Sequence, residues 1–521
     1  MAHAHVGSMD LTHAYPHEKT GLERFLDTVE RVGNKVPHPV VIFVLLIGLV
    51  ILLSHLFYLM GASVTYQTIN PETDAAEEVT TSVRSLLTRD GIRFMYEGVV
   101  SNFMAFTAVG VIIVAMLGVG VAESAGLVKA LIRKLVTVAP PAALTYILVG
   151  IGILSSIAAD AGYLVLIPLA AAAYVSVGRH PLAGLAASFA GVAAVFSVNI
   201  FIKPLDGILT EITNGAIHLL NPNQSISLTA NLWFSIASVL LLTIVVSLIS
   251  DRLIEPRLGP YTGATDAEGG SGVTAEETRG LKFALWGVLG VLAFFALLWL
   301  PPGAPLRNAE TGALIANSPF MNGLIVFIAL TFLVAGWAYG KGAGTITSSV
   351  DVTKAMEKAI AGLGGLIFLL FVISQFNAFF TYTNMATLAA VKMGDALETA
   401  GLGALPLLIG FVFVVGVLDL IMTGAIPKWA IFAPIFVPLL MRLNVTPEAV
   451  LAAYRVGDSP INSVSPLNAY FALIVSFARV YQKDAGVGTV IALMLPYVIA
   501  LFIVWPILLA VWHVLGLPWG V

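Results

Sequence analysis

The chain has 521 residues, of which 58% are hydrophobic and only 11% are charged. A soluble domain usually carries about a quarter charged residues, so this balance indicates a protein whose solvent is the lipid bilayer. The formal net charge of -4 suggests no nucleic-acid partner, and the absence of cysteine excludes disulfides and thiolate metal sites. Scattered histidines give no metal cluster, and no cofactor is expected. Roughly the first nine residues resemble an expression tag and are left out of the fold argument.

Nine apolar stretches are long enough to cross the hydrocarbon, because a transmembrane helix needs about 20 apolar residues. They are 39–62, 98–122, 182–203, 231–250, 281–300, 318–338, 358–383, 448–477 and 488–516. Two further apolar stretches, 141–177 and 403–443, are interrupted by small and polar residues at 155–162 and 423–428. Such interruptions need protein or water around them at membrane depth. We therefore predict an all-α polytopic membrane protein with nine transmembrane helices and two re-entrant helical hairpins.

Basic residues alternate between loops and so predict the orientation. Lys and Arg precede the first span and recur in 129–134, 252–282, 341–358 and 479–483, whereas 205–230 contains none. The loop at 63–93, with three arginines, is a partial exception. This pattern predicts a bacterial inner-membrane protein with a cytoplasmic N-terminus and an extracytoplasmic C-terminus.

An internal repeat relates the two halves of the chain. A shift of 266 residues places His180–Ala187 on Thr446–Ala453, and it also carries the first hairpin onto the second. An odd number of crossings separates the two copies, so their topologies are inverted. The predicted segments are a cytoplasmic N-terminus (1–37), a first span and extracytoplasmic loop (38–97), repeat one (98–250), linking loop and scaffold spans (251–357) and repeat two (358–521). Inverted repeats with broken segments are typical of secondary transporters.

The interruption in the first hairpin offers a candidate cation site. Asp160 lies there with Ser155 and Ser156 beside it, and an ionisable residue at membrane depth is a functional candidate by default. Carboxylate, hydroxyl and carbonyl oxygens suit a hard cation such as sodium. The alternative is that these serines only satisfy the broken backbone. Thr423, in the second hairpin, is a candidate of the same kind.

The segment after the second hairpin carries the densest group of polar residues. Arg455 and Asp458 are three apart and so share a helix face. Pro460 opens the helix beyond them, which leaves Asn462 and Ser463 beside free backbone groups. A guanidinium binds carboxylates bidentately, so Arg455 predicts an anionic substrate, and Asp458 with its neighbours predicts ion binding, sodium included. A structural pair between Arg455 and Asp458 is the alternative.

The equivalent positions in the first repeat are also polar. Ser197 and Asn199 match them, and Lys203 and Asp206 follow. Asn199 is a candidate ion ligand and Asp206 a candidate substrate ligand. Alternatively, Lys203 and Asp206 mark the outer interface, where a lysine can snorkel.

Other candidates come from aromatic and amide side chains. Trp429 could stack on an aromatic substrate with its repeat partner Tyr163 facing it, although packed aromatics are common. Asn377, Thr381 and Asn384 recur at a spacing of three or four residues, which predicts one polar stripe facing the bundle. Asp419 has no clear assignment, and Glu123 is expected at the interface.

From Ala425 to Pro438, and again at Pro447 and Tyr454–Ser459, the sequence resembles the AbgT family of p-aminobenzoyl-glutamate transporters. Segments 117–123, 178–187 and 483–489 are similar too, so the resemblance covers nearly the whole chain. It implies a homodimer whose protomers divide into scaffold and transport core. It also implies transport of folate-pathway compounds, with uptake of p-aminobenzoyl-glutamate in some members and export of sulfonamides in others, coupled to a proton or sodium gradient.

The resemblance also implies functional residues. The positions of this chain that match the family pattern are Asp206, Trp429, Pro447, Arg455 and Asp458. One departure is the tip of the second hairpin. There this chain has Ile426, Pro427 and Lys428, where a small polar residue is expected.

Together these observations predict a cation-coupled secondary transporter of a small anionic aromatic molecule, and no enzymatic activity. The two hairpins and the third and eighth spans would form a core that moves against the other spans. An ion-coupled dicarboxylate-type transporter is the main alternative. A channel is a further alternative, but it needs a continuous polar pore, and the paired inverted breaks fit alternating access better. An intramembrane aspartyl protease needs two carboxylates sharing a proton, and no second half of such a motif is recognisable.

Overall fold

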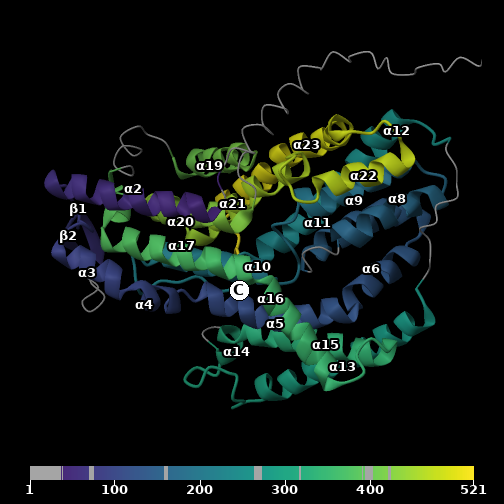
Figure 1. Ribbon diagram of the computed structural model, residues 1–521, viewed down its shortest axis with the longest axis horizontal. Helices are drawn as coiled ribbons and strands as arrows, with labels where there is room; N and C mark the ends of the chain where they lie inside the picture. Colours follow the sequence, from purple (N-terminus) through teal and green to yellow (C-terminus); the bar gives the residue numbers. More distant parts are fainter. Residues whose placement is uncertain are drawn as a thin grey trace, which may run out of the picture.

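Helices make up most of the described chain, which confirms the predicted all-α membrane class (Figure 1). The computed structural model describes residues 37, 39–69, 76–157, 162–262, 273–315, 318–389, 391–392, 403–420 and 424–521. Within these residues, eight helices are long and apolar enough to cross a membrane. They are α2 (Pro39–Leu59), α5 (Ala108–Ala125), α11 continued by η5 and α12 (Leu232–Leu258), α13 (Ala275–Trp299), α15 (Leu324–Ala343), α17 (Gly364–Tyr382), α20 (Ala425–Arg442) and α23 (Val487–Val514). All but α20 coincide with predicted spans.

Helix pairs occupy both predicted hairpin ranges. The first contains α7 (Leu144–Leu154), ended by the short turn η2 (Ser155–Ile157), and then η3 (Gly162–Leu166) and α8 (Ile167–Ser176). The second contains α19 (Ala404–Asp419) and α20. Asp160 and Thr423 lie outside the described residues, so nothing is said of their surroundings. Re-entry of each pair from one side of the bilayer stays a prediction.

The predicted third and eighth spans are not continuous helices, because each consists of two helices joined by an irregular segment; the sequence indicated such an opening only for the eighth, at Pro460. The third consists of α9 (Pro181–Phe189) with η4 (Ala190–Ala194) and, after an irregular segment, α10 (Pro204–Ile217). The eighth consists of α21 (Pro447–Asp458) with η6 (Pro460–Ser463) and, after another irregular segment, α22 (Phe471–Tyr481). Prolines and small polar residues in these segments interrupt the helical hydrogen bonds. The stretch 205–230 was expected to be an outer loop, but its first part, up to Ile217, belongs to α10.

The shift of 266 residues also appears in the backbone. Gly178 and Asn444, which are 444 − 178 = 266 apart, both have positive φ angles, 73° and 59°. Each lies between a hairpin helix and a broken helix, where left-handed backbone ends the first helix and redirects the chain. The two broken helices meet at their irregular ends, since η4 contacts η6. The inverted repeats thus converge on one place.

Several short elements were not predicted from the sequence. They are a two-stranded antiparallel sheet of β1 (Ser63–Ile69) and β2 (Ala76–Ser82) and the helices α3 (Arg89–Glu97), α6 (Leu127–Thr137) and α16 (Ser349–Gly362). The short helices α4 (Val99–Met104), η1 (Pro141–Ala143) and α14 (Pro319–Asn322) lie within predicted spans or hairpins but are separate from the helices that follow them. α6 turns by 115° into the first hairpin, at the consecutive prolines Pro140 and Pro141. These elements are too short or too polar for the 20-residue criterion that identified the spans.

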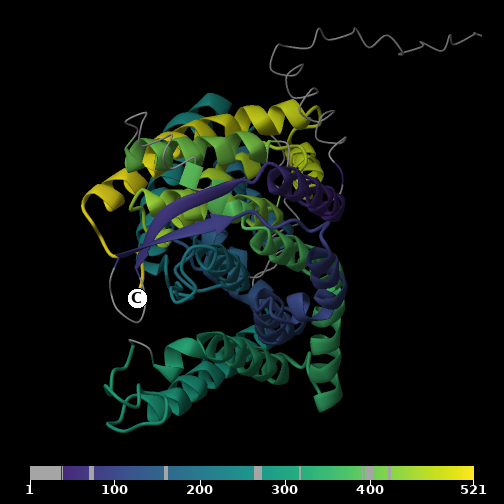
Figure 2. The ribbon, with the colours of Figure 1, turned by 90° about the vertical axis from the view of Figure 1, so that its left-hand side faces the viewer.

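Two hydrophobic clusters divide the molecule. The larger one joins the hairpins, the broken helices, α11, α17 and α23. The smaller one lies among α5, α6, α13, α15 and α16, at the lower edge of Figure 2. α5 and α15 approach closely there, because a Cβ added at Gly118 would lie 1.9 Å from the Ala329 carbonyl oxygen. We call the smaller unit the scaffold and the larger one the core.

Replacing Gly118 by Ala therefore tests the scaffold. The added methyl group forces α5 and α15 apart, with an expected loss of about 1–3 kcal/mol in the free energy of unfolding. Gly110→Ala in the same helix is the control, since no atom lies within 4 Å of its added Cβ. Thermal unfolding of the purified protein should show a lower Tm for the first variant and no loss for the second. Equal Tm values would contradict the close approach.

Candidate functional site

The two inverted repeats are joined by an ion pair inside the core. Arg455 of α21 donates from Nη1 to Asp206 Oδ1 of α10 at 2.6 Å. The same nitrogen donates to the Ser197 carbonyl at 2.7 Å, and Nε donates to Asn231 Oδ1 at 3.2 Å. The Arg455 side chain is only 3% exposed and the Asp206 side chain 13%. The guanidinium thus holds together segments that lie about half the chain apart.

Asp206 has a second role in local structure. Its Oδ2 accepts a hydrogen bond of 2.8 Å from the Lys203 amide, which caps the first turn of α10. An acidic residue at this position also complements the positive end of the helix dipole. One carboxylate therefore fixes the start of α10 and neutralises Arg455. The alternative of an Arg455–Asp458 pair is not what forms, because each residue has a different partner.

Asp458 belongs to a second buried cluster. Lys428 Nζ lies 2.6 Å from Asp458 Oδ1 and also contacts Asp419 Oδ1. Tyr454 Oη donates to Asp458 Oδ1 at 3.0 Å, and Ser197 Oγ donates to Asp458 Oδ2 at 3.3 Å. The three charged side chains are at most 1% exposed. The sequence analysis noted Lys428 and Asp419 but did not assign them to the site, although two charges near the middle of an apolar hairpin were a usable signal.

This cluster also bears on the protease alternative. Two aspartates do converge, on Lys428, although no sequence motif announced the second one. An ammonium group holds them, however, whereas aspartyl catalysis needs two carboxylates sharing one proton. The arrangement is an ion-pair network.

The first hairpin is tied to the broken helix beside it. Asn199 Nδ2 donates to the carbonyls of Ile153 and Leu154, at 3.1 and 3.2 Å, and to Ser156 Oγ at 3.0 Å. Lys203 Nζ donates to the Phe196 carbonyl and, at 3.4 Å, to Ser156 Oγ. Asn199 thus satisfies carbonyls that the end of α7 leaves without helical partners.

The lysine is 1% exposed, so it does not snorkel to the outer interface. The serines and Asn462 satisfy broken backbone as well. Ser155 Oγ donates to the Gly152 carbonyl, Ser156 Oγ to the Ile153 carbonyl and Ser463 Oγ to the Pro460 carbonyl. Asn462 Nδ2 donates to the Asp458 carbonyl at 2.8 Å.

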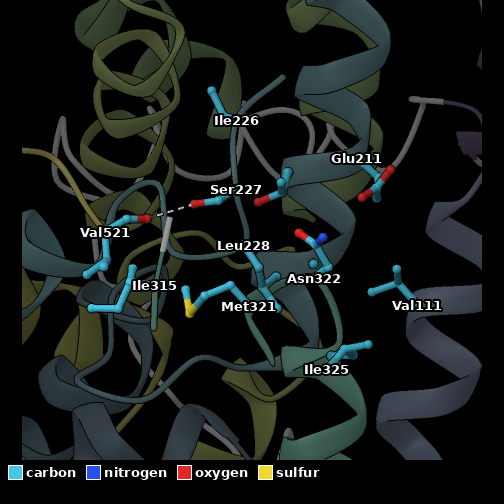
Figure 3. Close-up of a pocket in the computed structure, with 12 residues that line it drawn as sticks. Val111, Glu211, Ile226, Ser227, Leu228, Ile315, Met321, Asn322, Ile325 and Val521 are labelled. Atoms are coloured by element: carbon cyan, nitrogen blue, oxygen red, sulfur yellow. Dashed lines mark hydrogen bonds between the residues drawn. The ribbon is translucent and has the colours of Figure 1, made fainter. Parts of the chain in front are cut away.

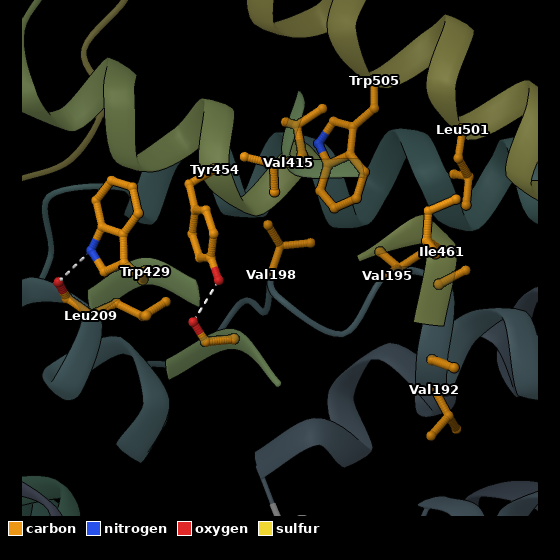
Figure 4. Packing of buried hydrophobic residues seen from close by; sticks show 14 of the residues in the cluster. Val192, Val195, Val198, Leu209, Val415, Trp429, Tyr454, Ile461, Leu501 and Trp505 are labelled. Carbon is orange, nitrogen blue, oxygen red and sulfur yellow. Dashed lines mark hydrogen bonds between the residues drawn. The ribbon is translucent and has the colours of Figure 1, made fainter. Parts of the chain in front are cut away.

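The aromatic candidates lie in different surroundings. Trp429 is fully buried and stacks on Tyr454 with ring centroids 4.5 Å apart, as Figure 4 shows. Its Nε1 donates to the Leu209 carbonyl at 3.2 Å and to Thr213 Oγ1 at 3.0 Å. Tyr163 instead stacks on Tyr470, with centroids 4.2 Å apart. Trp429 thus packs inside the core, and Tyr163 reaches its surface.

The other sequence candidates are spread out. Pro447 is the buried first residue of α21. Asn384 has left-handed backbone and donates to the Ser82 carbonyl at 3.0 Å, so it anchors the β-hairpin. Thr381 Oγ1 donates to the Asn377 carbonyl within α17. The prediction that all three residues face the bundle is wrong, because Thr381 is exposed and Asn384 is turned toward the two-stranded sheet.

A cavity of about 400 Å³ separates the core from the scaffold. Its walls come from α5, η2, η3, η4, α10, the tip of α20 and the segment before α22. The lining includes Met116, Glu123, Ser156, Tyr163, Phe196, Lys203, Leu205, Leu366, Ile426 and Tyr470. An adjoining cavity of about 360 Å³ shares Tyr163, Phe196 and Tyr470 and reaches Pro427, Asn462 and Asn468. Aromatic rings, one buried ammonium and the Glu123 carboxylate thus face a space of the size that small ligands occupy.

A third cavity, of about 340 Å³, lies between α10 and the start of α15. Figure 3 shows Glu211, Asn322 and Ser227 among its lining residues. Glu211 accepts a hydrogen bond from Thr107, the residue before α5. Both this cavity and the first are lined by one carboxylate, Glu211 here and Glu123 there, but only the first has a lysine in its lining, which makes the third cavity the poorer site for an anion.

The model of the AbgT putative transporter family matches residues 24–521. This chain belongs to that family. It is 35% identical over 494 residues to the p-aminobenzoyl-glutamate transport protein of Escherichia coli (strain K12), covering 94% of this chain and 95% of that protein. The resemblance noted in the sequence is confirmed.

Two solved structures share the fold of this AbgT member. The YdaH transporter of Alcanivorax borkumensis, described as having an unusual topology, is 39% identical with a TM-score of 0.86, covering 93% of this chain and 100% of that one. MtrF of Neisseria gonorrhoeae, described as illuminating a class of antimetabolite efflux pumps, is 38% identical with a TM-score of 0.88, covering 94% and 97%. The chain is thus a multi-pass membrane transporter, and the prediction that it is not an enzyme is confirmed.

The Arg455–Asp206 pair predicts an asymmetry in stability. Asp206→Ala leaves a buried guanidinium without its carboxylate, at an expected cost of about 3–5 kcal/mol in the free energy of unfolding. The double variant Asp206→Ala/Arg455→Met removes both charges and should unfold at a higher temperature than the single variant. Thermal unfolding of the purified proteins checks this order. A single variant as stable as the unchanged protein would show that the pair does not hold the repeats together.

Proposed function

We propose that this chain is a cation-coupled secondary transporter of p-aminobenzoyl-glutamate or a related folate-pathway aromatic anion. The observation that carries the proposal is the cavity between core and scaffold, which combines stacked aromatic rings with a buried ammonium. The similarity to a p-aminobenzoyl-glutamate transport protein along nearly the whole chain supports the substrate class.

The lining suits the two ends of such a molecule. Tyr163, Phe196 and Tyr470 offer ring faces and edges for a benzamide group. Lys203 Nζ is bound only to neutral oxygens in the described structure, namely Ser156 Oγ and the Phe196 carbonyl. A substrate carboxylate is a stronger partner for an ammonium than either of them. We assign first contact with the substrate to these residues.

The sequence pointed instead to Trp429 and Arg455 as substrate ligands. In this conformation Arg455 is engaged by Asp206, and Trp429 is packed on Tyr454. We therefore place them behind the first contact surface. They would reach the substrate only if it displaced these protein partners.

Charge balance in the core favours coupling to a cation. The core holds three carboxylates and three cationic side chains in the two networks and beside the first hairpin. They are Asp206, Asp419, Asp458, Lys203, Lys428 and Arg455. An anionic substrate adds negative charge to a neutral unit, and charge inside a bilayer is costly. A sodium ion or proton carried with the anion offsets this charge.

The transport movement follows from the two packing units. We propose alternating access, in which the hairpins and broken helices move against α5, α13, α15 and α16. The cavity lies along this boundary, so sliding would open it to one side and then the other. The protein would act as a homodimer in the bacterial inner membrane, with a cytoplasmic N-terminus.

Export of antimetabolites such as sulfonamides is the second candidate function. It is favoured by the TM-score of 0.88 with MtrF, which is described with a class of antimetabolite efflux pumps. A sulfonamide shares the aminobenzene ring of p-aminobenzoyl-glutamate and lacks its glutamate carboxylates. The aromatic rings of the cavity suit both molecules, whereas Lys203 favours the dianionic p-aminobenzoyl-glutamate over the sulfonamide.

Uptake of labelled p-aminobenzoyl-glutamate into proteoliposomes tests the function. We expect saturable accumulation above equilibrium when a sodium gradient or a proton gradient is imposed, with the effective gradient naming the coupling ion. Vesicles containing an Asp458→Ala variant are the control, because this change should abolish gradient-driven uptake. Absence of accumulation under either gradient, with verified insertion, contradicts the substrate assignment and makes sulfonamide efflux the next assay.

Lys203→Gln tests the anion contact. The amide keeps a hydrogen-bond donor and loses the charge, so KM for p-aminobenzoyl-glutamate should rise about tenfold or more. Transport of a neutral sulfonamide, where measurable, should change much less. Lys354→Gln, at an exposed lysine of α16, is the matched control. An unchanged KM in the Lys203 variant contradicts the assigned contact.

The natural absence of cysteine makes the orientation testable. Single variants Asn221→Cys and Ser349→Cys place one thiol in each of two exposed segments. A membrane-impermeant thiol reagent applied to intact cells should label position 221 from outside and position 349 only after lysis. The reverse pattern would overturn the proposed orientation.

A further inference from the structure

Lys428 lies where a bound metal cation would be expected. Its Nζ contacts Asp419 Oδ1 from α19 and Asp458 Oδ1 from α21, so it bridges two elements that enclose it. Tyr454 Oη contacts the same Asp458 oxygen and also donates to the Ala425 carbonyl. Carboxylate, hydroxyl and carbonyl oxygens are the ligand types that hard cations prefer. The cluster is therefore an oxygen site already filled by an ammonium.

One carboxylate oxygen of this cluster is unsatisfied. Asp419 Oδ2 is buried and has no hydrogen-bond partner among the described residues. Buried carboxylate oxygens are normally satisfied, and each exception asks for an explanation. The ammonium engages only the other oxygen of this carboxylate, so the site offers more acceptor capacity than a lysine uses. A spherical cation coordinating both oxygens would use it.

The surrounding charges do not alter this conclusion. Arg455 neutralises Asp206, and its nearest link to the cluster is Ser197, whose carbonyl binds Arg455 and whose hydroxyl binds Asp458. Lys203 is engaged with the Phe196 carbonyl and Ser156 near the first hairpin. Two carboxylates and one ammonium therefore give the cluster a net charge of −1. Without the ammonium the charge is −2, and a cation would be strongly attracted.

We propose that Lys428 is a tethered cation that takes the place of a metal ion between Asp419 and Asp458. It excludes sodium from this position and leaves Asp419 Oδ2 as the acceptor available to a proton. Lys428 thus determines which ion the core can hold at the second hairpin. The inference deepens the proposed function by assigning ion selectivity to one residue of the same core.

The test is to remove the lysine and look for a new sodium site. Thermal unfolding of the purified full chain is measured in sodium chloride and in choline chloride at equal ionic strength, without substrate. Lys428→Ala vacates the position and keeps both carboxylates, so sodium should raise its Tm by about 3 °C or more beyond the effect on the unchanged protein. Potassium, which is larger, should act more weakly.

Two matched variants separate a site from a general loss of stability. Lys428→Met removes the charge but fills the volume, and the double variant Lys428→Ala/Asp419→Asn leaves the space with one carboxylate fewer. Neither should gain the sodium-specific rise in Tm. No gain in Lys428→Ala, or an equal gain in Lys428→Met, would overturn the proposal. If Lys428→Ala is not recovered folded, Lys428→Ser is measured against the same two outcomes.

This measurement is independent of substrate and of transport. A protein that fails to accumulate p-aminobenzoyl-glutamate can still show the new sodium effect, and then only the proposed substrate is lost. Conversely, an active transporter whose Lys428→Ala variant ignores sodium keeps its proposed function and loses the tethered cation.

Discussion

The arrangement of helices at the centre of this protein depends on the free-energy cost of burying charged side chains. Removing an ion from water costs several kcal/mol even after relaxation, and a buried ion that loses its partner is strongly destabilising. Here the partners come from different elements. Arg455 on α21 depends on Asp206 at the start of α10, and Lys428 on α20 depends on Asp419 and Asp458 on α19 and α21. The second hairpin and both broken helices cannot separate without exposing an unpaired charge. They are therefore expected to move together, as the proposed transport core requires.

The scaffold is held together by a different kind of contact. Gly118 and Gly336 let α5 and α15 approach so closely that an added Cβ would strike backbone atoms of the opposite helix. Small residues give close helix packing in membranes, where lipid removes most of the hydrophobic drive between helices. Such packing has no alternative partners and is rigid. The polar core, by contrast, can exchange hydrogen bonds as it moves. The boundary between these two kinds of packing is where the cavity lies.

How much the sequence predicted depended on which physical signal was available. Hydrophobic length identified the intact spans, and the shift of 266 residues identified the repeats, because both are properties of the chain alone. Length also misled, since 182–203 and 448–477 are apolar enough to span and yet are broken near polar residues and prolines. Arg455, Asp458 and Asp206 were found because charge at membrane depth is rare. That Arg455 pairs with Asp206, and Asp458 with Lys428, was not found, because pairing depends on how distant segments pack. Asp419 and Lys428 are nine residues apart in sequence and lie on two different helices, α19 and α20, that pack against each other.

The same packing explains why the predicted substrate residues and the cavity differ. Arg455 and Trp429 have the chemistry to bind an aromatic anion, but in this conformation their polar atoms are engaged by Asp206, Leu209 and Thr213. A substrate could reach them only by displacing protein partners of equal quality, which yields little net free energy. Lys203 is different, since its ammonium has only neutral oxygen partners in the described structure. A substrate carboxylate would be a stronger partner for this ammonium than the neutral oxygens that it replaces. Recognition is therefore expected where the core is least well paired, and the well-paired networks behind it keep the core intact as it moves.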